Sequence, residues 1–509
     1  MPTNRRRARG SRLCALALLG LVPTLAYADC NLNDSTIHIR RNIYSLAASP
    51  DGQKIIDDLR KGVAAMMKKP ESDPTSWLSQ ADIHGVPPGD HSPPLRLWNN
   101  CQHGTYFFFS WHRMYIWYFE RILRKASGDP NFALPYWNYS DDPSQAPMPA
   151  AFRDPAGRSN SLYLSNPDLR SDDANGGAPM PPDVSTYAQA FADTNFDSPR
   201  GRSGPDGVAP SFGGQIVPQP IHFGDIHGGL ESQPHDVVHV WIGGQGAPGG
   251  QAPGLMSDPE TAARDPIFWI HHANVDRLWK RWLDQGGRRA NPLSDSEWAG
   301  QQFTFYDEDG KHCSLTGKQV VDTAAQLKYR YDDDPANPPR ALMANASPTP
   351  VAPARPPQVY ALMPPRANAV SLEQQQVMVP LKLTSSGETA IAPTVPSNKP
   401  LLLNVEGVDY DRSPGVYYQV YLNLPPGTKP DPKGPYYVGN LSLFALKGGT
   451  RRFDVTKVVS NLKSQGLWKA DQLAVTMIAR SSSHPKNPSA AAAPIAGKPR
   501  FARISLSGE

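Results

Sequence analysis

The chain changes its pattern of hydrophobic and polar positions about two-thirds of the way along. In the first part, apolar residues recur at helical spacing and predict helices. The predicted helices span residues 39–67, 111–123, 234–241 and 265–283. Pro266 lies near the first turn of the last one and two glycines follow its end, which is typical of a helix start and stop. Residues 141–220 are rich in Pro, Gly, Asp and Ser and are expected to form loops.

After a Pro/Ala-rich stretch at residues 346–366, the pattern changes to short apolar runs separated by Gly, Pro and Asn. The predicted strands span residues 377–379, 401–403, 417–422, 441–446 and 473–478. A chain of 509 residues is long enough for two folded domains. The sequence therefore predicts a mainly α domain over residues 29–345, a linker over 346–366, and a small all-β C-terminal domain over 367–509.

Residues 1–28 have the three regions of an export signal. Five arginines precede the apolar run 13–25, and Ala26-Tyr27-Ala28 follows as a small-x-small cleavage site. The apolar run is too short to span a bilayer. We expect export to the periplasm or the medium after cleavage near Ala28, with no membrane span; the alternative is a retained amphipathic N-terminus.

The positive charge of the chain belongs to this leader. The whole sequence has a net charge of +4, but the rest of the chain holds 46 basic against 47 acidic side chains once the five leader arginines are removed. Nucleic acid is therefore not indicated as a partner. Cys14 also lies in the leader, which leaves Cys30, Cys101 and Cys313, an odd number for an exported protein.

Several of the 13 histidines stand at spacings that suit a metal site. His235 and His239 are separated by one helical turn, so their imidazoles lie on one face within reach of one ion. His271 and His272 are adjacent within a predicted helix, so only one of them can face a shared site. Further upstream, His112 opens an aromatic helix and His103 precedes it by nine residues.

Each of these histidine features is weak evidence by itself, because two histidines one helical turn apart more often lie on the surface or in the core than in a metal site. Together they form a cluster with no matching Cys or carboxylate spacing, which favours copper or zinc. Of these two metals, only copper supports redox chemistry.

Three segments carry a family resemblance. The segment 98–123, WNNCQHGTYFFFSWHRMYIWYFERIL, resembles the first copper motif of tyrosinases and polyphenol oxidases. The segment 265–279, DPIFWIHHANVDRLW, is similar to their second motif, and PHDVVHVW at 234–241 precedes it. The resemblance implies a four-helix bundle that holds a binuclear copper site, with O₂ as co-substrate and small phenols, both monophenols and catechols, as substrates.

The resemblance also implies which side chains bind the metal. The implied copper A ligands are His84, His103 and His112, and the implied copper B ligands are His235, His239 and His272. His91 is the alternative to His84 as the first copper A ligand. We favour His84 because residues 79–85 resemble the helix before the first ligand in plant polyphenol oxidases, whereas His91 lies in a Pro/Gly loop. In the family, the second histidine of the 271/272 pair binds copper. The resemblance therefore implies that His271 and Asp276 lie next to the ligands without binding the metal.

Cys101 stands two residues before His103, as in fungal tyrosinases, in which such a cysteine forms a thioether with the ligand histidine. The resemblance therefore implies a Cys101–His103 bond, which would leave Cys30 and Cys313 to form a disulfide. The alternative is that Cys101 is a plain buried thiol.

The resemblance implies a base and a gate near the metal pair. Glu231 matches a glutamate that positions a water in related enzymes, and Asp236 follows His235 directly; a surface acid is the alternative for Asp236. Pro259 stands 13 residues before His272, where plant catechol oxidases often carry Phe. The smaller Pro259 predicts a more open pocket, and these features favour tyrosinase activity.

The C-terminal segment 415–423, GVYYQVYLN, resembles the domain that covers the copper site in plant polyphenol oxidases. A β-sandwich that only stabilises the fold is the alternative. For the whole chain, the alternatives to a tyrosinase are a catechol oxidase without hydroxylase activity, a hemocyanin-like dioxygen-binding protein, and a structural zinc protein.

Overall fold

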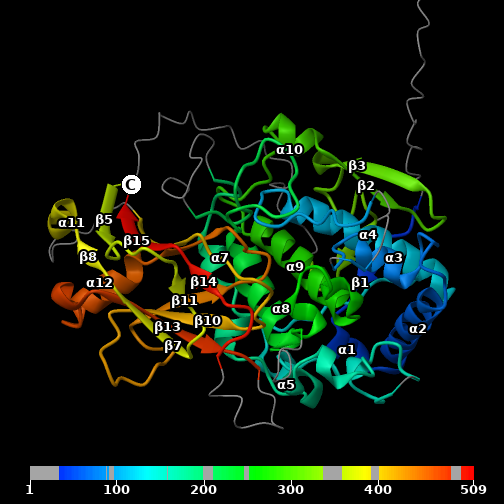
Figure 1. Ribbon diagram of the computed structural model, residues 1–509. Coiled ribbons are helices and arrows are strands. Elements are labelled where there is room, and N and C mark those ends of the chain that lie inside the picture. The colour runs from blue at the N-terminus through cyan, green and yellow to red at the C-terminus, as the bar shows by residue number, and fades with distance from the viewer. Residues whose placement is uncertain are drawn as a thin grey trace, which may run out of the picture.

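The computed structural model describes residues 34–87, 89–90, 97–157, 159–198, 210–245, 252–335, 358–390, 400–482 and 494–508. The leader, Cys30, His91 and most of the expected linker lie outside these residues. Among the described residues, a helical part and a β-rich C-terminal part lie side by side, with α8 and α9 near the middle of the molecule (Figure 1).

The predicted helix over residues 39–67 is in fact three elements. They are β1 (His38–Arg40), α1 (Ile43–Ala47) and α2 (Pro50–Met67). The Ser49 side chain accepts a hydrogen bond from the Gly52 amide, and Pro50 occupies the first turn of α2. A capping serine followed by proline starts a new helix, and the apolar periodicity runs across this break.

Four helices supply or flank the predicted metal ligands. They are α3 (Trp77–Asp82), α4 (Phe108–Ser127), α8 (Asp236–Gly243) and α9 (Ile267–Asp284). A kinked segment at Glu231–His235, in which the backbone of Gln233 is extended, precedes α8. Helix α4 packs against α2 on one side and α9 on another, and nearly all its side chains are buried. The helices that carry the predicted ligands therefore lie inside the core.

The expected loop over residues 141–220 contains short helices among its turns. These are α5 (Asp172–Gly176), α6 (Pro182–Ser185) and α7 (Ala188–Ala192), with 3₁₀ turns at Pro143–Gln145, Ala150–Phe152 and Pro167–Leu169. After α9 come α10 (Ser296–Gly300), the hairpin of β2 (Gln302–Tyr306) and β3 (His312–Thr316), and β4 (Tyr329–Tyr331), which pairs with β1.

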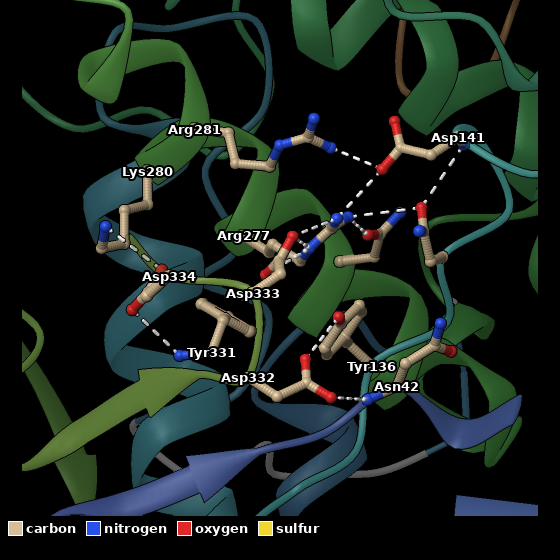
Figure 2. A network of polar contacts seen from close by, with 12 residues as sticks. Asn42, Tyr136, Asp141, Arg277, Lys280, Arg281, Tyr331, Asp332, Asp333 and Asp334 are labelled. Atoms are coloured by element: carbon tan, nitrogen blue, oxygen red, sulfur yellow. Dashed lines mark hydrogen bonds and ion pairs between the residues drawn. The ribbon is translucent and has the colours of Figure 1, made fainter. Parts of the chain in front are cut away.

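A network of ion pairs holds the segment after β4 against α9 (Figure 2). Arg277 donates to the carboxylates of Asp333 and Asp141, and Lys280 pairs with Asp334. Tyr136 donates to Asp332. These contacts fix residues 332–334 before the chain leaves the helical part.

The C-terminal part contains two main sheets. One has the strand order β11-β10-β13-β7 and the other β12-β9-β15-β5-β8. The strand bounds are β5 Gln358–Leu362, β7 Gln376–Pro380, β8 Lys382–Leu383, β9 Leu401–Glu406, β10 Tyr417–Leu422, β11 Tyr437–Ser442, β12 Thr450–Asp454, β13 Ala474–Arg480 and β15 Arg503–Gly508. A small pair joins β6 (Val370–Ser371) to β14 (Arg500–Phe501).

The all-β prediction for the C-terminal part was too narrow. It also contains α11 (Ser385–Ala390) and α12 (Thr456–Ser464). Strand β5 lies within the stretch expected to be linker, yet it pairs with both β15 and β8. The sheet therefore includes residues of that stretch.

The two parts pack directly against each other. Helix α8 contacts β10 and β11. Asn440 on β11 donates to the carbonyl of Asp183 on α6, and Gln419 on β10 donates to the Asp183 carboxylate. No helix among the described residues is long and apolar enough to cross a membrane.

Candidate metal centre

Six buried imidazoles converge between the helices. His84 follows α3, His103 lies in the loop before α4, and His112 lies on α4. On the other side, His235 ends the kinked segment before α8, His239 lies on α8 and His272 on α9. Within the first group the ring centroids are 5.2–5.6 Å apart, and within the second 4.6–5.6 Å. The groups adjoin, since the His112 and His272 rings are 4.6 Å apart.

Hydrogen bonds at Nδ1 fix most of these rings. Nδ1 of His84, His112 and His239 donates to the carbonyls of Pro259, Phe108 and Met256, at 2.8, 2.9 and 2.9 Å. Nδ1 of His235 donates to Asp236 Oδ1 at 2.8 Å. A proton on Nδ1 leaves the Nε2 lone pair free for a metal ion, and such outer contacts typically orient ligand imidazoles.

The Nε2 atoms are left without protein donors. Those of His84, His103 and His112 are buried and have no hydrogen-bond partner. Nε2 of His272 lies 3.3 Å from Nε2 of His235 and 3.4 Å from that of His239. Facing lone pairs at this distance repel each other unless a cation lies between them. The donor set therefore fits metal ions that prefer imidazole.

Burial keeps these imidazoles neutral. It lowers the pKa of His84, His103, His235, His239 and His272 well below the usual histidine value, and the neighbouring imidazoles lower it further. Burial also lowers the pKa of His112 to about 3. Neutral imidazole is the form that binds a metal ion.

A second loop holds His103 in place. Its amide donates to the His222 carbonyl, and its carbonyl accepts from the Gly224 amide. A Cβ on Gly104 would lie 2.4 Å from the Gly224 carbonyl oxygen, and Gly104 has a φ of +64°. Only glycine allows the two loops to pass this closely.

Cys101 lies beside this pair of loops. Its sulfur is 3.2 Å from His103 Nδ1 and 3.4 Å from His222 Nδ1, and the cysteine is free and buried. Cys101 is therefore adjacent to the ring with which a thioether is expected. Cys313 is disulfide-bonded, and its partner lies outside the described residues.

His271 and Asp276 lie around the ligands in different ways. His271 Nδ1 is 3.1 Å from the Tyr139 hydroxyl, and its buried Nε2 faces the second histidine group without a hydrogen-bond partner. Asp276 touches none of the ligand rings among the described contacts. It accepts from Arg113, which follows His112, and from Tyr329, so it joins α9 to α4 and β4.

The two predicted carboxylates form a buried cluster with a histidine that sequence reasoning missed. Nδ1 of His227 is 2.8 Å from Asp236 Oδ2 and 3.6 Å from Glu231 Oε1. The other oxygen of Asp236 holds His235, while Glu231 Oε1 accepts from the Gly104 amide and Oε2 has no partner. Asp236 is thus buried rather than a surface acid.

Burial and charge oppose each other in this cluster. Burial would lower the pKa of His227, but the Glu231 and Asp236 carboxylates raise it to about 9. Burial raises the pKa of Glu231 to about 8 although His227 lowers it, and burial also raises the pKa of Asp236. Metal ions beside these groups would favour the ionised carboxylates.

Pro259, the predicted gate, and Phe444, from the C-terminal part, lie at different places around the candidate ligands. Pro259 is buried, and its carbonyl anchors His84. Phe444, from the loop after β11, reaches over the metal centre. Its ring stacks on that of His239, with centroids 4.2 Å apart, and lies 5.7 and 5.8 Å from the His103 and His235 rings. A residue of the C-terminal part therefore occupies the space next to the candidate ligands.

Sequence reasoning missed His222, His227 and Phe444. The two histidines lie in an irregular loop without helical or strand periodicity. Phe444 lies in an apolar run that reads as core. The contacts that give these residues their places join segments far apart in the sequence.

Comparison with known proteins agrees with this site. The profile for the common central domain of tyrosinase matches residues 74–285, the polyphenol oxidase middle domain matches 292–348, and a domain of unknown function matches 362–489. A tyrosinase from Hahella sp. (strain CCB-MM4) is 30% identical over 492 residues, covering 87% of this chain and 95% of that protein. The latent form of a chloroplastic polyphenol oxidase from Prunus armeniaca is 32% identical over 301 residues, covering 56% of this chain and 48% of its own length.

Solved structures share the fold. A recombinant latent aurone synthase (polyphenol oxidase) aligns with a TM-score of 0.59 and 24% identity, covering 94% of this chain and 90% of that one. Latent apple tyrosinase aligns with a TM-score of 0.58 and 23% identity, covering 95% and 99%. These structures confirm a helical core with a sheet-containing C-terminal region. From the near full-length match to the bacterial tyrosinase, and from the profiles on both sides of residue 290, the chain belongs to the tyrosinase and polyphenol oxidase family.

Proposed function

We propose that this chain is a tyrosinase that hydroxylates monophenols at the ortho position and oxidises catechols to o-quinones. Copper-dependent phenol oxidation follows from family membership. The finer assignment is supported by one observation: two carboxylates are buried next to the candidate ligands, Asp236 against His235 and Glu231 against the amide of Gly104, which follows His103. A monophenol must lose its proton before hydroxylation, and a carboxylate at this position is suited to accept it.

Six histidines would hold the two copper ions. His84, His103 and His112 would bind copper A, and His235, His239 and His272 would bind copper B. When bound there, the copper pair supplies the redox chemistry, activating dioxygen and accepting electrons from the phenol. The thioether between Cys101 and His103, and the disulfide between Cys30 and Cys313, are part of this proposal.

The protein residues around the metal pair would orient the substrate and move its proton. Glu231 Oε2 is buried and free of hydrogen bonds, so it can hold a water or accept the phenol proton. Asp236 keeps the His235 ring in the Nδ1-protonated form. The aromatic rings of Phe108 and Phe268 pack against the ligand imidazoles and exclude water from them.

We further propose that the C-terminal part holds the enzyme in a covered, latent form. Phe444 stacks on His239 where a phenol ring would approach copper B. A substrate and Phe444 cannot both fill this space. The release of the tail, by cleavage in the predicted linker (residues 346–366) or by mild detergent, is then required for full activity.

One experiment tests the assignment. Oxygen uptake and product formation are measured with tyramine, 4-methylcatechol and an o-aminophenol, on copper-loaded full-length protein and after linker cleavage. Hydroxylation of tyramine supports a tyrosinase. Oxidation of 4-methylcatechol without any hydroxylation would support a catechol oxidase instead, and reversible O₂ binding without quinone would support a hemocyanin-like carrier.

A further inference from the structure

The loop at residues 222–228 lies between the metal centre and the C-terminal part. On one side its backbone holds His103, through the His222 carbonyl and the Gly224 amide. On the other side, the Asp225 carbonyl accepts from the amide of Thr450 at the start of β12. This loop is therefore in contact with both parts of the molecule at once.

The side chain of His227, in this loop, makes contacts in two opposite directions. Its Nδ1 faces Asp236 Oδ2 at 2.8 Å, and its Nε2 faces the Ala445 carbonyl oxygen at 3.2 Å. A carboxylate and a carbonyl are both acceptors, so both ring nitrogens must donate. The charged groups around the ring are Glu231 and Asp236 on the catalytic side, and Arg451 lies near Asp236 on β12 of the tail.

Each residue that His227 contacts is in turn bonded or adjacent to a residue at the metal centre. Asp236 is bonded through its other oxygen to His235, a predicted copper B ligand. Ala445 follows Phe444, whose ring covers His239. Ala445 also has a φ of +52°, a left-handed conformation that is unfavourable for any residue other than glycine, Asn or Asp, so this turn depends on contacts such as that with His227.

We propose that His227 is a positioning residue that acts through two separate hydrogen bonds, called here its Nδ1 arm and its Nε2 arm. Its Nδ1 arm orients Asp236 and, through it, the copper B ligand His235. Its Nε2 arm holds the Phe444–Ala445 turn over the metal centre. The inference rests on the proposed metal centre and tail cover, and it adds the residue that joins them.

The two arms can be removed one at a time. In His227→Asn, the side-chain amide lies near the position of Nδ1, so the arm to Asp236 is kept and the arm to Ala445 is lost. In His227→Gln, the amide lies near the position of Nε2, so the arm to Ala445 is kept and the arm to Asp236 is lost. The two variants are matched in chemistry and differ by one methylene.

The test uses the copper-loaded full-length protein and two measurements that do not depend on turnover. One is the rate of copper loss to excess bathocuproine under reducing conditions, and the other is amide hydrogen exchange in residues 443–446. A hydrogen bond to a charged donor corresponds to about tenfold in an equilibrium. We expect His227→Asn to raise exchange in the turn about tenfold with copper loss unchanged, and His227→Gln to raise copper loss about tenfold with exchange unchanged.

Two outcomes would overturn the proposal: both measurements change together in both variants, or neither changes in either variant. Should a His227 variant fail to fold, Ala445→Val provides the test from the tail side, because a β-branched residue disfavours the left-handed turn. It should raise exchange in the turn without faster copper loss, and faster copper loss would count against the proposal. Quinone formation from 4-methylcatechol by the wild type is scored separately, so a failure of the catalytic assignment is distinguishable.

Discussion

The Phe444 ring stacks on the His239 imidazole, with 4.2 Å between ring centroids and 20° between ring planes. His239 comes from the middle of the catalytic helices and Phe444 from the loop after β11, so the stack joins the two parts of the protein at the metal centre. Stacking of a neutral imidazole on an aromatic ring is a favourable contact in a buried place that contains no water.

Replacing Phe444 with Ala should raise catechol oxidation by the full-length protein several-fold, because the ring that fills the substrate position is lost. Copper content should stay at two per chain. Initial rates with 4-methylcatechol measure the change. Met378→Ala, at an exposed tail residue, is the control and should leave the rate unchanged. A Phe444→Ala rate equal to that of the wild type would show that the cover does not limit access.

Replacing His272 with Ala should remove copper B and abolish oxidase activity, because three imidazoles are needed to hold each ion. We expect about one copper per chain by elemental analysis, with far-ultraviolet circular dichroism close to that of the wild type. The exposed His312 on β3 is the matched control, and His312→Ala should keep both ions. Two coppers and normal turnover in His272→Ala would refute the ligand assignment.

Replacing Pro259 with Phe should reduce tyramine hydroxylation roughly tenfold and catechol oxidation much less, since hydroxylation has the stricter docking geometry. The carbonyl that anchors His84 is retained in this variant, so copper A should remain. Pro259→Ala is the control for loss of the proline ring alone. Equal losses on both substrates would mean that residue 259 does not act as a selective gate.

Asp193 should make stability depend on pH. Burial raises its pKa to about 7 from an ordinary 3.8, with Asp454 raising it further and Arg451 opposing the rise. Between about pH 4 and 7 the folded state keeps a proton that the unfolded state has lost, so this group lowers the free energy of unfolding as pH rises through that window. Above pH 7 the cost is constant.

The Asp193→Asn variant cannot titrate, so it should be more stable than the wild type by about 2 kcal/mol at pH 8, allowing for solvent screening of this half-buried side chain. At pH 4 the gain should vanish. Urea unfolding at both pH values measures the difference. A gain of the same size at pH 4 and pH 8 would show that the effect is not electrostatic.

Much of the helical part could be predicted from the sequence because its ligand helices have strong periodicity. Helices α4 and α9 begin and end within a few residues of the predicted segments. The pattern 39–67 failed because apolar spacing continues across Ser49 and Pro50, where the backbone breaks. Local capping decided that boundary, and periodicity does not detect it.

In the candidate site, too, residues in local motifs could be predicted, and residues placed by contacts between segments could not. The six histidines and the two carboxylates stand in local motifs, and the structure brings all eight side chains together. His227 and Phe444 are placed by contacts with residues of other segments, among them the contact of His227 with Ala445 and that of Phe444 with His239. No local pattern in an irregular loop or in an apolar strand end carries that information.

The position of β15 has a consequence for the order of events during synthesis. This strand, Arg503–Gly508, lies between β9 and β5 in the five-stranded sheet, with neighbours on both sides. The sheet cannot be completed before these residues have left the ribosome, whereas every candidate ligand helix has emerged long before. The helical part, with all its candidate ligands, is therefore fully synthesised before the five-stranded sheet of the C-terminal part can close around its last strand.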